Sequence, residues 1–257
     1  MIFEKADLAN AHRIVVKIGS SSISGASSKL GPLVAAVAKS HAAGCEVILV
    51  TSGAIATGMP LLNIESKPDD LATSQALASV GQSRLIARYQ ASLDGFGIVA
   101  GQVLLTADDL EGAETRSNAK RAMERLLELR VLPIVNENDT VATAEIRFGD
   151  NDRLAALVAV LVEADALILL SDVDALYTAP PSQPGAVRLD EVEFEDDLSS
   201  IDIGGSGSSV GTGGAVTKVS AAKLANEHGI PVLLTSADNV AEALNGTSEG
   251  TWFKARK

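Results

Sequence analysis

Short runs of β-branched and aliphatic residues alternate with longer segments of helical period along most of this chain of 257 residues. Strands buried on both faces have this continuous apolar composition, and helices between them carry the chain back across a parallel sheet. The pattern predicts strands at residues 13–18, 46–51, 98–105, 132–136, 166–171 and 231–235. It predicts helices at residues 29–43, 71–93, 118–129, 151–164, 217–228 and 238–244, and shorter strands near 141–149, 177 and 187–192. We therefore expect a three-layer α/β/α fold with a central, mostly parallel sheet.

Two of the predicted strands run directly into loops of small residues. Lys17 precedes the segment from Gly19 to Ser22, and the strand at 46–51 precedes Ser52-Gly53-Ala54. Glycine in such a loop lets backbone N–H groups approach an anion, and ligands of open α/β sheets bind at the carboxyl ends of the strands. An ordinary turn with an exposed lysine, or a serine N-cap, would have the same sequence. Neither loop has the spacing of a Walker A or Rossmann glycine motif.

Amide and carboxylate side chains gather in two further loops. The segment 136–140 reads Asn-Glu-Asn-Asp-Thr after an apolar strand, and residues 149–152 read Gly-Asp-Asn-Asp before an apolar helix. One of the latter acids can be explained as an N-cap or by the helix dipole. Together the two loops suit a small zwitterionic substrate, because their oxygens accept from an ammonium and their amides donate to a carboxylate. A metal site is the competing interpretation, although no histidine lies among these residues.

A second lysine closes the most glycine-rich segment of the chain. Eleven of the sixteen residues from 199 to 214 are Gly or Ser, a composition that would ordinarily indicate a flexible linker. The segment leads directly into an amphipathic helix with Lys218 in its first turn, which favours a loop that wraps phosphates. Lys17 and Lys218 would then supply positive charge from opposite sides of a phosphoryl group.

Composition excludes several other classes of function. The net charge of −12 and the 3% aromatic content argue against nucleic-acid binding and against an anionic membrane surface. A single cysteine, Cys45, forms no disulfide within the chain, and the first residues lack the pattern of a signal peptide. We expect a cytoplasmic protein.

In this order, the segments resemble the amino acid kinase family, and within it the branch that phosphorylates glutamate. The resemblance extends from about residue 13 to residue 252. It is carried by the motifs VKIGSS at 16–21, VTSGAIATG at 50–58, QALASVGQ at 75–82, PIVNEND at 133–139, FGDND at 148–152, LSDVDALY at 170–177 and GTGGAVTK at 211–218. The NEND and FGDND motifs separate this branch from the acetylglutamate, carbamate and UMP kinases.

The resemblance implies transfer of the ATP γ-phosphoryl group to the side-chain carboxylate of L-glutamate, which gives γ-glutamyl phosphate for proline biosynthesis. It implies that Lys17 and Lys218 neutralise the phosphates and that Asp150 holds both ammonium groups. The residues implied to bind glutamate are Ser52, Gly53, Ala54, Asn136, Asp139 and Asn151. The residues implied to bind ATP are Lys17, Gly19, Ser20, Ser171, Asp172, Tyr177, Gly211, Thr212, Gly213, Gly214, Ala215, Val216, Thr217 and Lys218. No metal ligand is implied, because Mg²⁺ arrives on the ATP phosphates.

The resemblance also suggests how the chain is organised and regulated. It implies one amino acid kinase domain over 1–257, with a glutamate-binding lobe at about 1–164, a nucleotide-binding lobe at about 165–257, and no C-terminal PUA domain. It implies a homo-oligomer, a dimer or tetramer, with proline as a candidate feedback inhibitor. Two alternatives stay open: a family member acting on a different small carboxylate, and a non-catalytic sensor of proline or glutamate.

Overall fold

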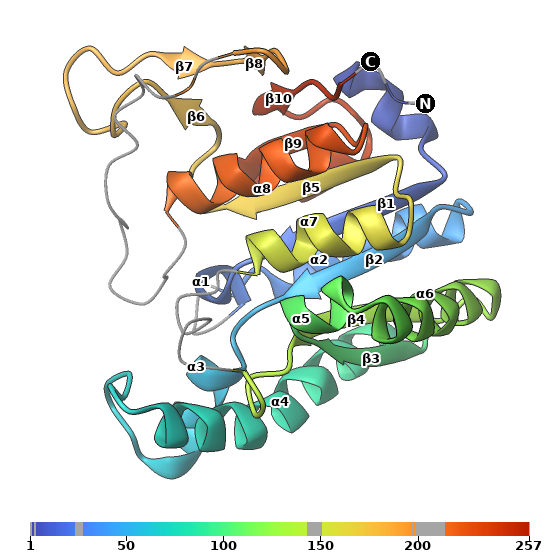
Figure 1. Cartoon of the computed structure of the whole chain (residues 1–257), viewed down its shortest axis with the longest axis vertical. Helices are drawn as coiled ribbons and strands as arrows, with labels where there is room; N and C mark the ends of the chain where they lie inside the picture. Colours follow the sequence, from blue (N-terminus) through green and yellow to red (C-terminus); the bar gives the residue numbers. More distant parts are fainter. Residues whose placement is uncertain are drawn as a thin grey trace.

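A central sheet runs through the computed structural model, which describes residues 2, 4–23, 28–142, 151–196, 198 and 214–256 (Figure 1). Within this part of the chain the sheet has eight strands in the order β3-β4-β2-β1-β5-β9-β10-β8. Their bounds are Ala100–Leu105 (β3), Leu132–Glu137 (β4), Glu46–Thr51 (β2), Arg13–Ile18 (β1), Ala166–Ser171 (β5), Val232–Ser236 (β9), Thr251–Phe253 (β10) and Glu191–Val192 (β8). Neighbouring strands are parallel except for β9 and β10.

The register of the sheet brings the ends of its central strands together. Ile18, the last residue of β1, lies opposite Thr51 of β2 on one side and Leu170 of β5 on the other. The chain builds β2, β3 and β4 on one side of β1 and then β5 and β9 on the other. Ligands of open α/β sheets bind where the strand order reverses in this way. The loops after β1, β2, β4 and β5 therefore define the edge at which a site is expected.

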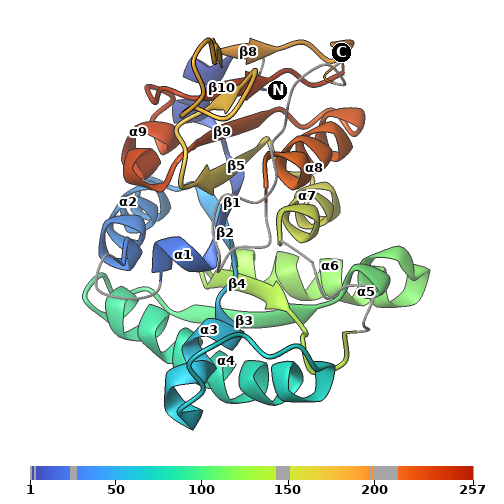
Figure 2. The ribbon, with the colours of Figure 1, turned by 90° about the vertical axis from the view of Figure 1, so that its left-hand side faces the viewer.

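Helices cover both faces of the sheet, as the two views at right angles show (Figures 1 and 2). One face is covered by α2 (Leu30–Ala42), α4 (Leu71–Asp94) and α9 (Val240–Leu244), and the other by α5 (Ala107–Glu111), α6 (Ala113–Glu128), α7 (Asp152–Leu161) and α8 (Ala215–Glu227). Short helical segments are η1 (Lys5–Asn10), α1 (Ser20–Ile23), α3 (Ala54–Gly58), η2 (Met59–Leu62) and η5 (Ala237–Asn239). The predicted three-layer fold is confirmed.

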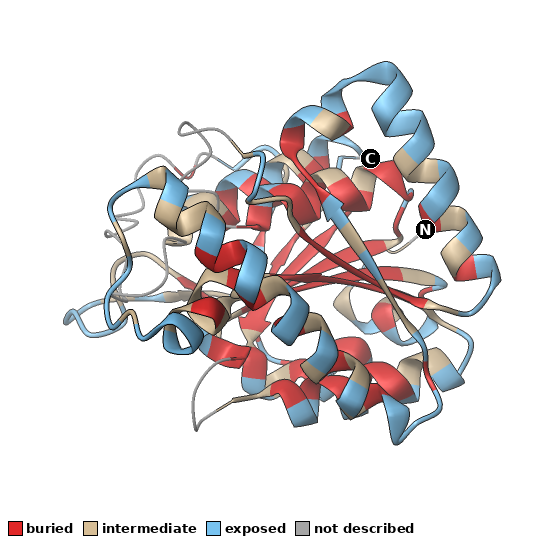
Figure 3. Cartoon of the chain, turned by 90° about the horizontal axis from the view of Figure 1, so that it is seen from below, coloured by how far each residue is buried: buried red, intermediate tan, exposed pale blue. Residues whose placement is uncertain are grey.

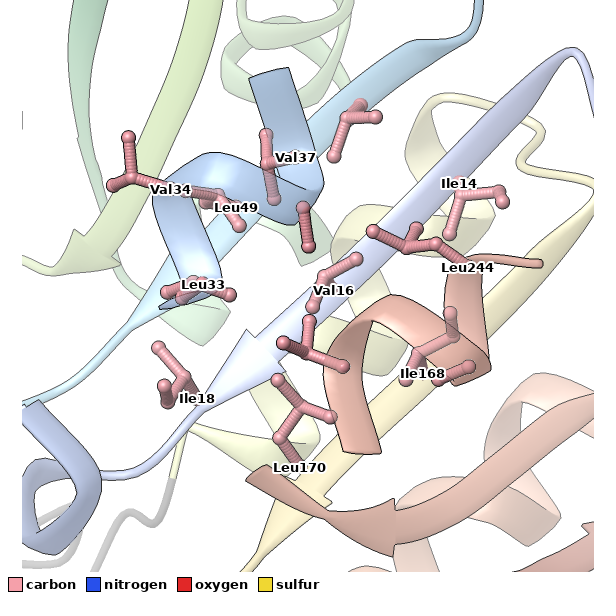
Figure 4. Close-up of a cluster of buried hydrophobic side chains, with 14 of the residues drawn as sticks. Ile14, Val16, Ile18, Leu33, Val34, Val37, Leu49, Ile168, Leu170 and Leu244 are labelled. Atoms are coloured by element: carbon pink, nitrogen blue, oxygen red, sulfur yellow. The ribbon is translucent and has the colours of Figure 1, made fainter. Parts of the chain in front are cut away.

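The hydrophobic core is divided by the sheet into two clusters. Alternation along β1 sends Ile14, Val16 and Ile18 to the α2 and α9 face, where they pack with Ile168 and Leu244 (Figure 4). The next position along, Val15, belongs to the cluster under α7 and α8. Both clusters combine residues from before and after residue 165, so the two halves of the chain share one core. Figure 3 shows that the strands are buried and that the helices on either side of the sheet are exposed on their outer faces.

Most of the predicted elements are present in the structure, and most of the differences concern where an element begins or ends. The helix expected at 118–129 begins earlier, at Ala113, where Ala113, Glu114 and Arg116 are good helix formers and Glu114 lies in the first turn. The helix expected at 238–244 divides into η5 and α9. Strand β10, three residues long, was not predicted.

Two short strands form a separate hairpin beyond β5. They are β6 (Leu176–Tyr177) and β7 (Arg188–Leu189), which pair antiparallel and agree with the short strands expected there. The strand and turn expected at 141–149 fall mostly on residues 143–150, outside the described part of the chain. Among the described helices, none combines the length and the apolar character that crossing a membrane requires.

Candidate active site

Two lysines that lie far apart in the sequence meet on one buried carboxylate. Lys17 shares its face of β1 with Val15, so its side chain is directed toward α7 and α8, and it is only 2% exposed. Its Nζ lies 2.6 Å from Oδ1 of Asp152, and Nζ of Lys218 lies 3.0 Å from Oδ2 of the same residue. Thr217 donates a hydrogen bond to that second oxygen at 3.1 Å. Two ammonium groups, one from β1 and one from α8, thus lie on either side of one carboxylate.

Both lysines contact Asp152, a residue that the sequence analysis did not select. The resemblance assigned the role of holding both ammonium groups to Asp150, which lies outside the described residues. The place of Asp152 in the first turn of α7 also suits a residue that offsets the helix dipole, which is the simpler interpretation from sequence. A signal was available: Asp152 is in helical register with Ala155, Ala156 and Ala159, all completely buried. A carboxylate in the apolar stripe of a helix needs a buried charge partner.

The small-residue loops after β1 and β2 lie side by side. Gly53 has a φ of 101°, a left-handed conformation that favours glycine. A Cβ built on it would lie 3.2 Å from Ile23 and 3.4 Å from Ser20. Ser52 is partly exposed next to Gly53, and Ala54 is buried as the first residue of α3. The structure thus brings the Gly19–Ser20 and Ser52–Ala54 segments to one place, at the sheet edge that also carries Lys17.

A chain of side-chain amides crosses the same edge. Asn151, the N-cap residue of α7, donates through Nδ2 to the carbonyl oxygen of Thr51 and, at 2.7 Å, to Oδ1 of Asn136. Asn136, near the end of β4, donates through its own Nδ2 to Oε1 of Gln82 at 2.6 Å. The two asparagines are 4% and 2% exposed. These contacts join two predicted substrate residues to Gln82 of α4.

Two carboxyl groups beyond this chain of amides have raised pKa values. Burial, together with repulsion from Asp139, Asp109 and Asp108, raises the pKa of Glu137 to about 7. Burial raises the pKa of Asp139 to about 6. Within the described residues, Oε1 of Glu137 is buried without a hydrogen-bond partner. This end of the site therefore disfavours its own negative charge until a cation arrives.

The predicted nucleotide residues lie mostly on the opposite side of β1. Ser171 ends β5, and the exposed carboxylate of Asp172 accepts a hydrogen bond from Ser21 at 2.9 Å, which ties the loop after β5 to the loop after β1. Tyr177 lies on the β6–β7 hairpin and donates to Asp174 at 2.9 Å. Through that hydrogen bond Asp174 raises the pKa of the tyrosine.

The glycine-rich segment before α8 is described only from Gly214 onward. Gly214 is the N-cap residue of α8, and Ala215, Val216, Thr217 and Lys218 form the first turn. Val216 is 56% exposed, whereas Lys218 is buried against Asp152. Gly211, Thr212 and Gly213 lie outside the described residues. The described contacts bring together Lys17, Lys218 and Thr217, and the amide chain joins Asn136 to Asn151; none of them links Tyr177 to the lysines.

Comparison with known proteins identifies similar sequences over nearly the whole chain. The amino acid kinase family matches residues 12–236. A glutamate 5-kinase from Clavibacter sepedonicus is 66% identical over 253 residues, which cover 98% of both chains. One from Leifsonia xyli subsp. xyli is 64% identical over 98% of this chain and 94% of its own. One from Streptomyces coelicolor is 54% identical over 96% of this chain but only 68% of its own.

Solved structures show the same fold at low sequence identity. Carbamate kinase from Giardia lamblia, bound to AMP-PNP, matches 96% of this chain with a TM-score of 0.68 and 14% identity. An isopentenyl phosphate kinase matches 95% of it with a TM-score of 0.65 and 20% identity. These similarities concern the fold, and the evidence on substrate comes from the closer sequence relatives.

Proposed function

This chain belongs to the amino acid kinase family, and from that premise we propose that it is a glutamate 5-kinase. It transfers the γ-phosphoryl group of ATP to the side-chain carboxylate of L-glutamate and forms γ-glutamyl phosphate, the first intermediate of proline biosynthesis. The observation that carries the proposal is the meeting of Lys17 and Lys218 on Asp152. Two fixed ammonium groups that come together from different elements suit the negative charge of a phosphoryl group in transfer.

Positive charge and alignment are the main requirements of this reaction. An oxygen of the glutamate γ-carboxylate attacks the γ-phosphorus, the bond from that phosphorus to the β,γ-bridging oxygen breaks, and ADP leaves. A carboxylate with an ordinary pKa near 4.3 is already ionised at neutral pH, so no general base is needed. Lys17 and Lys218 neutralise the moving group and the leaving phosphate, and Asp152 fixes both ammonium groups before the substrates bind.

Glutamate lies, in this proposal, at the end of the sheet that carries the amide chain. Ser52, Gly53, Ala54, Asn136, Asp139 and Asn151 contact it. Asp139 accepts hydrogen bonds from the substrate ammonium, whose charge would offset the burial that raises the pKa of this carboxyl group. Ser171, Asp172, Tyr177 and the residues from Gly211 to Lys218 contact ATP on the other side of β1. Residues up to about 164 thus form the glutamate lobe and the rest the nucleotide lobe.

Three further features belong to the proposal. Mg²⁺ enters on the ATP phosphates and neutralises part of their charge when bound. The described residues contain no group of three or more His, Cys, Asp or Glu side chains that could hold a metal ion, and we assign no residue to Mg²⁺. Proline is a feedback inhibitor. The enzyme is a homo-oligomer, a suggestion supported by the edge strand β3, where Leu104 is 37% exposed.

A direct assay tests the function. Purified protein is incubated with Mg-ATP and L-glutamate, ADP release is followed, and hydroxylamine traps the acyl phosphate as a hydroxamate. We expect ADP and hydroxamate to form in equal amounts, with much less ADP when N-acetylglutamate, aspartate or UMP replaces glutamate. ADP release that does not depend on glutamate, or that is faster with another acceptor, would contradict the proposal.

A further inference from the structure

The amide chain Gln82–Asn136–Asn151 has a direction that is set by a backbone carbonyl. The oxygen of Thr51 can only accept, so the amide group next to it must be the nitrogen of Asn151. That nitrogen also faces Asn136, which must present its oxygen in return. Asn136 then presents its nitrogen to Gln82, which answers with Oε1. One anchored contact therefore determines the orientation of all three amides, since each amide oxygen must face a donor and each amide nitrogen an acceptor.

This direction leaves different groups at the two ends of the chain. At one end Asn151 keeps an oxygen that can accept, and at the other end Gln82 keeps an NH₂ group that can donate. Within the described residues, neither the Asn151 oxygen nor the Gln82 nitrogen makes a hydrogen bond, and Gln82 is partly exposed. The Asn151 end adjoins Asp152 and the lysines. The Gln82 end belongs to α4, which packs on the opposite face of the sheet from α7 and α8.

Close packing of α4 fixes where Gln82 can reach. A Cβ built on its neighbour Gly81 would lie 1.8 Å from the carbonyl oxygen of Ala54, so the backbones of α4 and α3 are in direct contact. Two turns before Gln82, on the same face of α4, Gln75 donates to the carbonyl oxygen of Ala142 at 3.2 Å. The helix is thus held against both the Ser52–Ala54 segment and the loop that carries Asp139. Gln82 lies between these two predicted substrate segments.

We propose that Gln82 is a specificity-determining residue whose amide N–H groups donate to the α-carboxylate of the amino acid substrate. This inference rests on the proposed function and adds a residue to it. The γ-carboxylate of glutamate must lie near the lysines, so its α-carboxylate lies at the remote end, where a donor is needed. A neutral amide donates to that carboxylate without neutralising Glu137 and Asp139, which await the substrate ammonium.

Replacement of the donor by an acceptor tests this role. Gln82→Glu keeps the side-chain shape and an oxygen for Asn136 but places a carboxylate oxygen where the NH₂ group was. At pH 8 we expect KM for L-glutamate to rise about 10- to 100-fold, with KM for ATP changed less than about twofold. For the α-carboxamide analogue of glutamate, which keeps the γ-carboxylate, kcat/KM should fall less in this variant. The preference for L-glutamate over the analogue, as the ratio of the two kcat/KM values, should therefore fall by about tenfold or more. Gln102→Glu, an exposed substitution on β3, is the matched control and should change neither value.

Several outcomes decide the inference. Unchanged KM and unchanged preference in a folded Gln82→Glu variant would overturn it, because a residue that only positions Asn136 keeps its acceptor in that variant. If that variant does not fold, Gln82→Met replaces it: it should raise KM for L-glutamate at least about tenfold, and an unchanged KM would overturn the inference. Absence of glutamate-dependent turnover in the unmodified enzyme would instead overturn the proposed function, and the inference with it.

Discussion

The two charged ends of the site differ in how their charges are compensated. At the lysine end, two buried ammonium groups share the carboxylate of Asp152 at 2.6 and 3.0 Å. At the acidic end, burial raises the pKa of Glu137 to about 7 and that of Asp139 to about 6, and the charged neighbours of Glu137 are mostly further carboxylates. One end is held together by its own ion pairs. At the other end, within the described residues, neither Glu137 nor Asp139 forms an ion pair, and the charges of Arg153 and Lys67 offset the rise of their pKa values only in part.

The difference indicates when each end acts. Charges that are paired before any ligand binds are already aligned, so they can stabilise a transition state without reorganisation. Carboxyl groups whose pKa values are raised by burial gain an ion-pair partner when the substrate ammonium binds, so we expect them to act in binding. We therefore expect substitutions at the lysine end to lower turnover and substitutions at the acidic end to change substrate affinity.

The largest effect is expected from Lys218→Ala. This variant removes a charge that acts on the phosphoryl group and leaves Lys17 and Asp152 as a neutral pair, so the fold should hold. Turnover should fall by about a thousandfold or more, measured by hydroxamate formation, with folding checked by circular dichroism. Lys223→Ala on the exposed face of α8 is the control. Normal turnover in folded Lys218→Ala would contradict a transition-state role.

Asp152→Asn should affect stability more than Lys218→Ala does. It removes the carboxylate charge that lies between the two ammonium groups, which then repel each other more strongly in a buried place. We expect a loss of about 3 to 5 kcal/mol in the free energy of unfolding, measured by urea denaturation. A loss equal to that of Lys218→Ala would mean that the shared carboxylate is not what holds the lysines together.

Asp139→Asn tests the acidic end. The substitution keeps the shape of the side chain and removes the charge proposed to bind the substrate ammonium. KM for L-glutamate should rise about 10- to 100-fold, whereas KM for ATP and kcat should change little. Steady-state kinetics with each substrate varied in turn provide the measurement. A fall in kcat with an unchanged KM for glutamate would show that the two ends do not divide binding from chemistry.

The smallest effect is expected from Glu137→Gln, and it should depend on pH. An acid whose pKa is raised in the folded state stabilises the fold while protonated, and this contribution is lost as pH rises from about 4.5 through about 7. Glutamine does not titrate, so the variant should be close to the parent in stability at pH 5. At pH 8 it should be more stable by about 1 to 2 kcal/mol, a value discounted for partial exposure. Urea denaturation at both pH values measures the free energy of unfolding of the variant and of the parent. If the difference between the two proteins were the same at pH 5 and at pH 8, the prediction would be refuted.

Much of the fold was predictable because the relevant signals are local. The strands at 13–18, 46–51 and 166–171 have the predicted bounds, since continuous aliphatic runs between turn residues leave few alternatives. Strand β10 was missed because three residues carry almost no periodicity, and its pairing with β9 depends on the rest of the sheet. The short helices α1 and α5 were missed for the same reason, since four or five residues show little helical periodicity.

The candidate site was predictable to a lesser extent. The loops that follow parallel strands meet at one edge of the sheet. The sequence therefore predicts that Lys17, Ser52, Asn136 and Asn151 lie at that edge. The partner of the two lysines was not predictable in this way. Asp150 and Asp152 are two positions apart in the sequence just before and at the start of α7, and the local sequence does not show which of the two contacts the lysines.

The sequence by itself determined the layers, the parallel sheet and the chemical types gathered at its edge, because periodicity and loop composition act over a few residues. The tertiary structure decided which groups touch: Asp152 receives both lysines, and the amides from Gln82 to Asn151 point in one direction. These choices depend on atoms from β1, β4, α4, α7 and α8 meeting within about 3 Å, a condition of distance and direction that hydrogen bonds impose and that spacing along the chain does not encode.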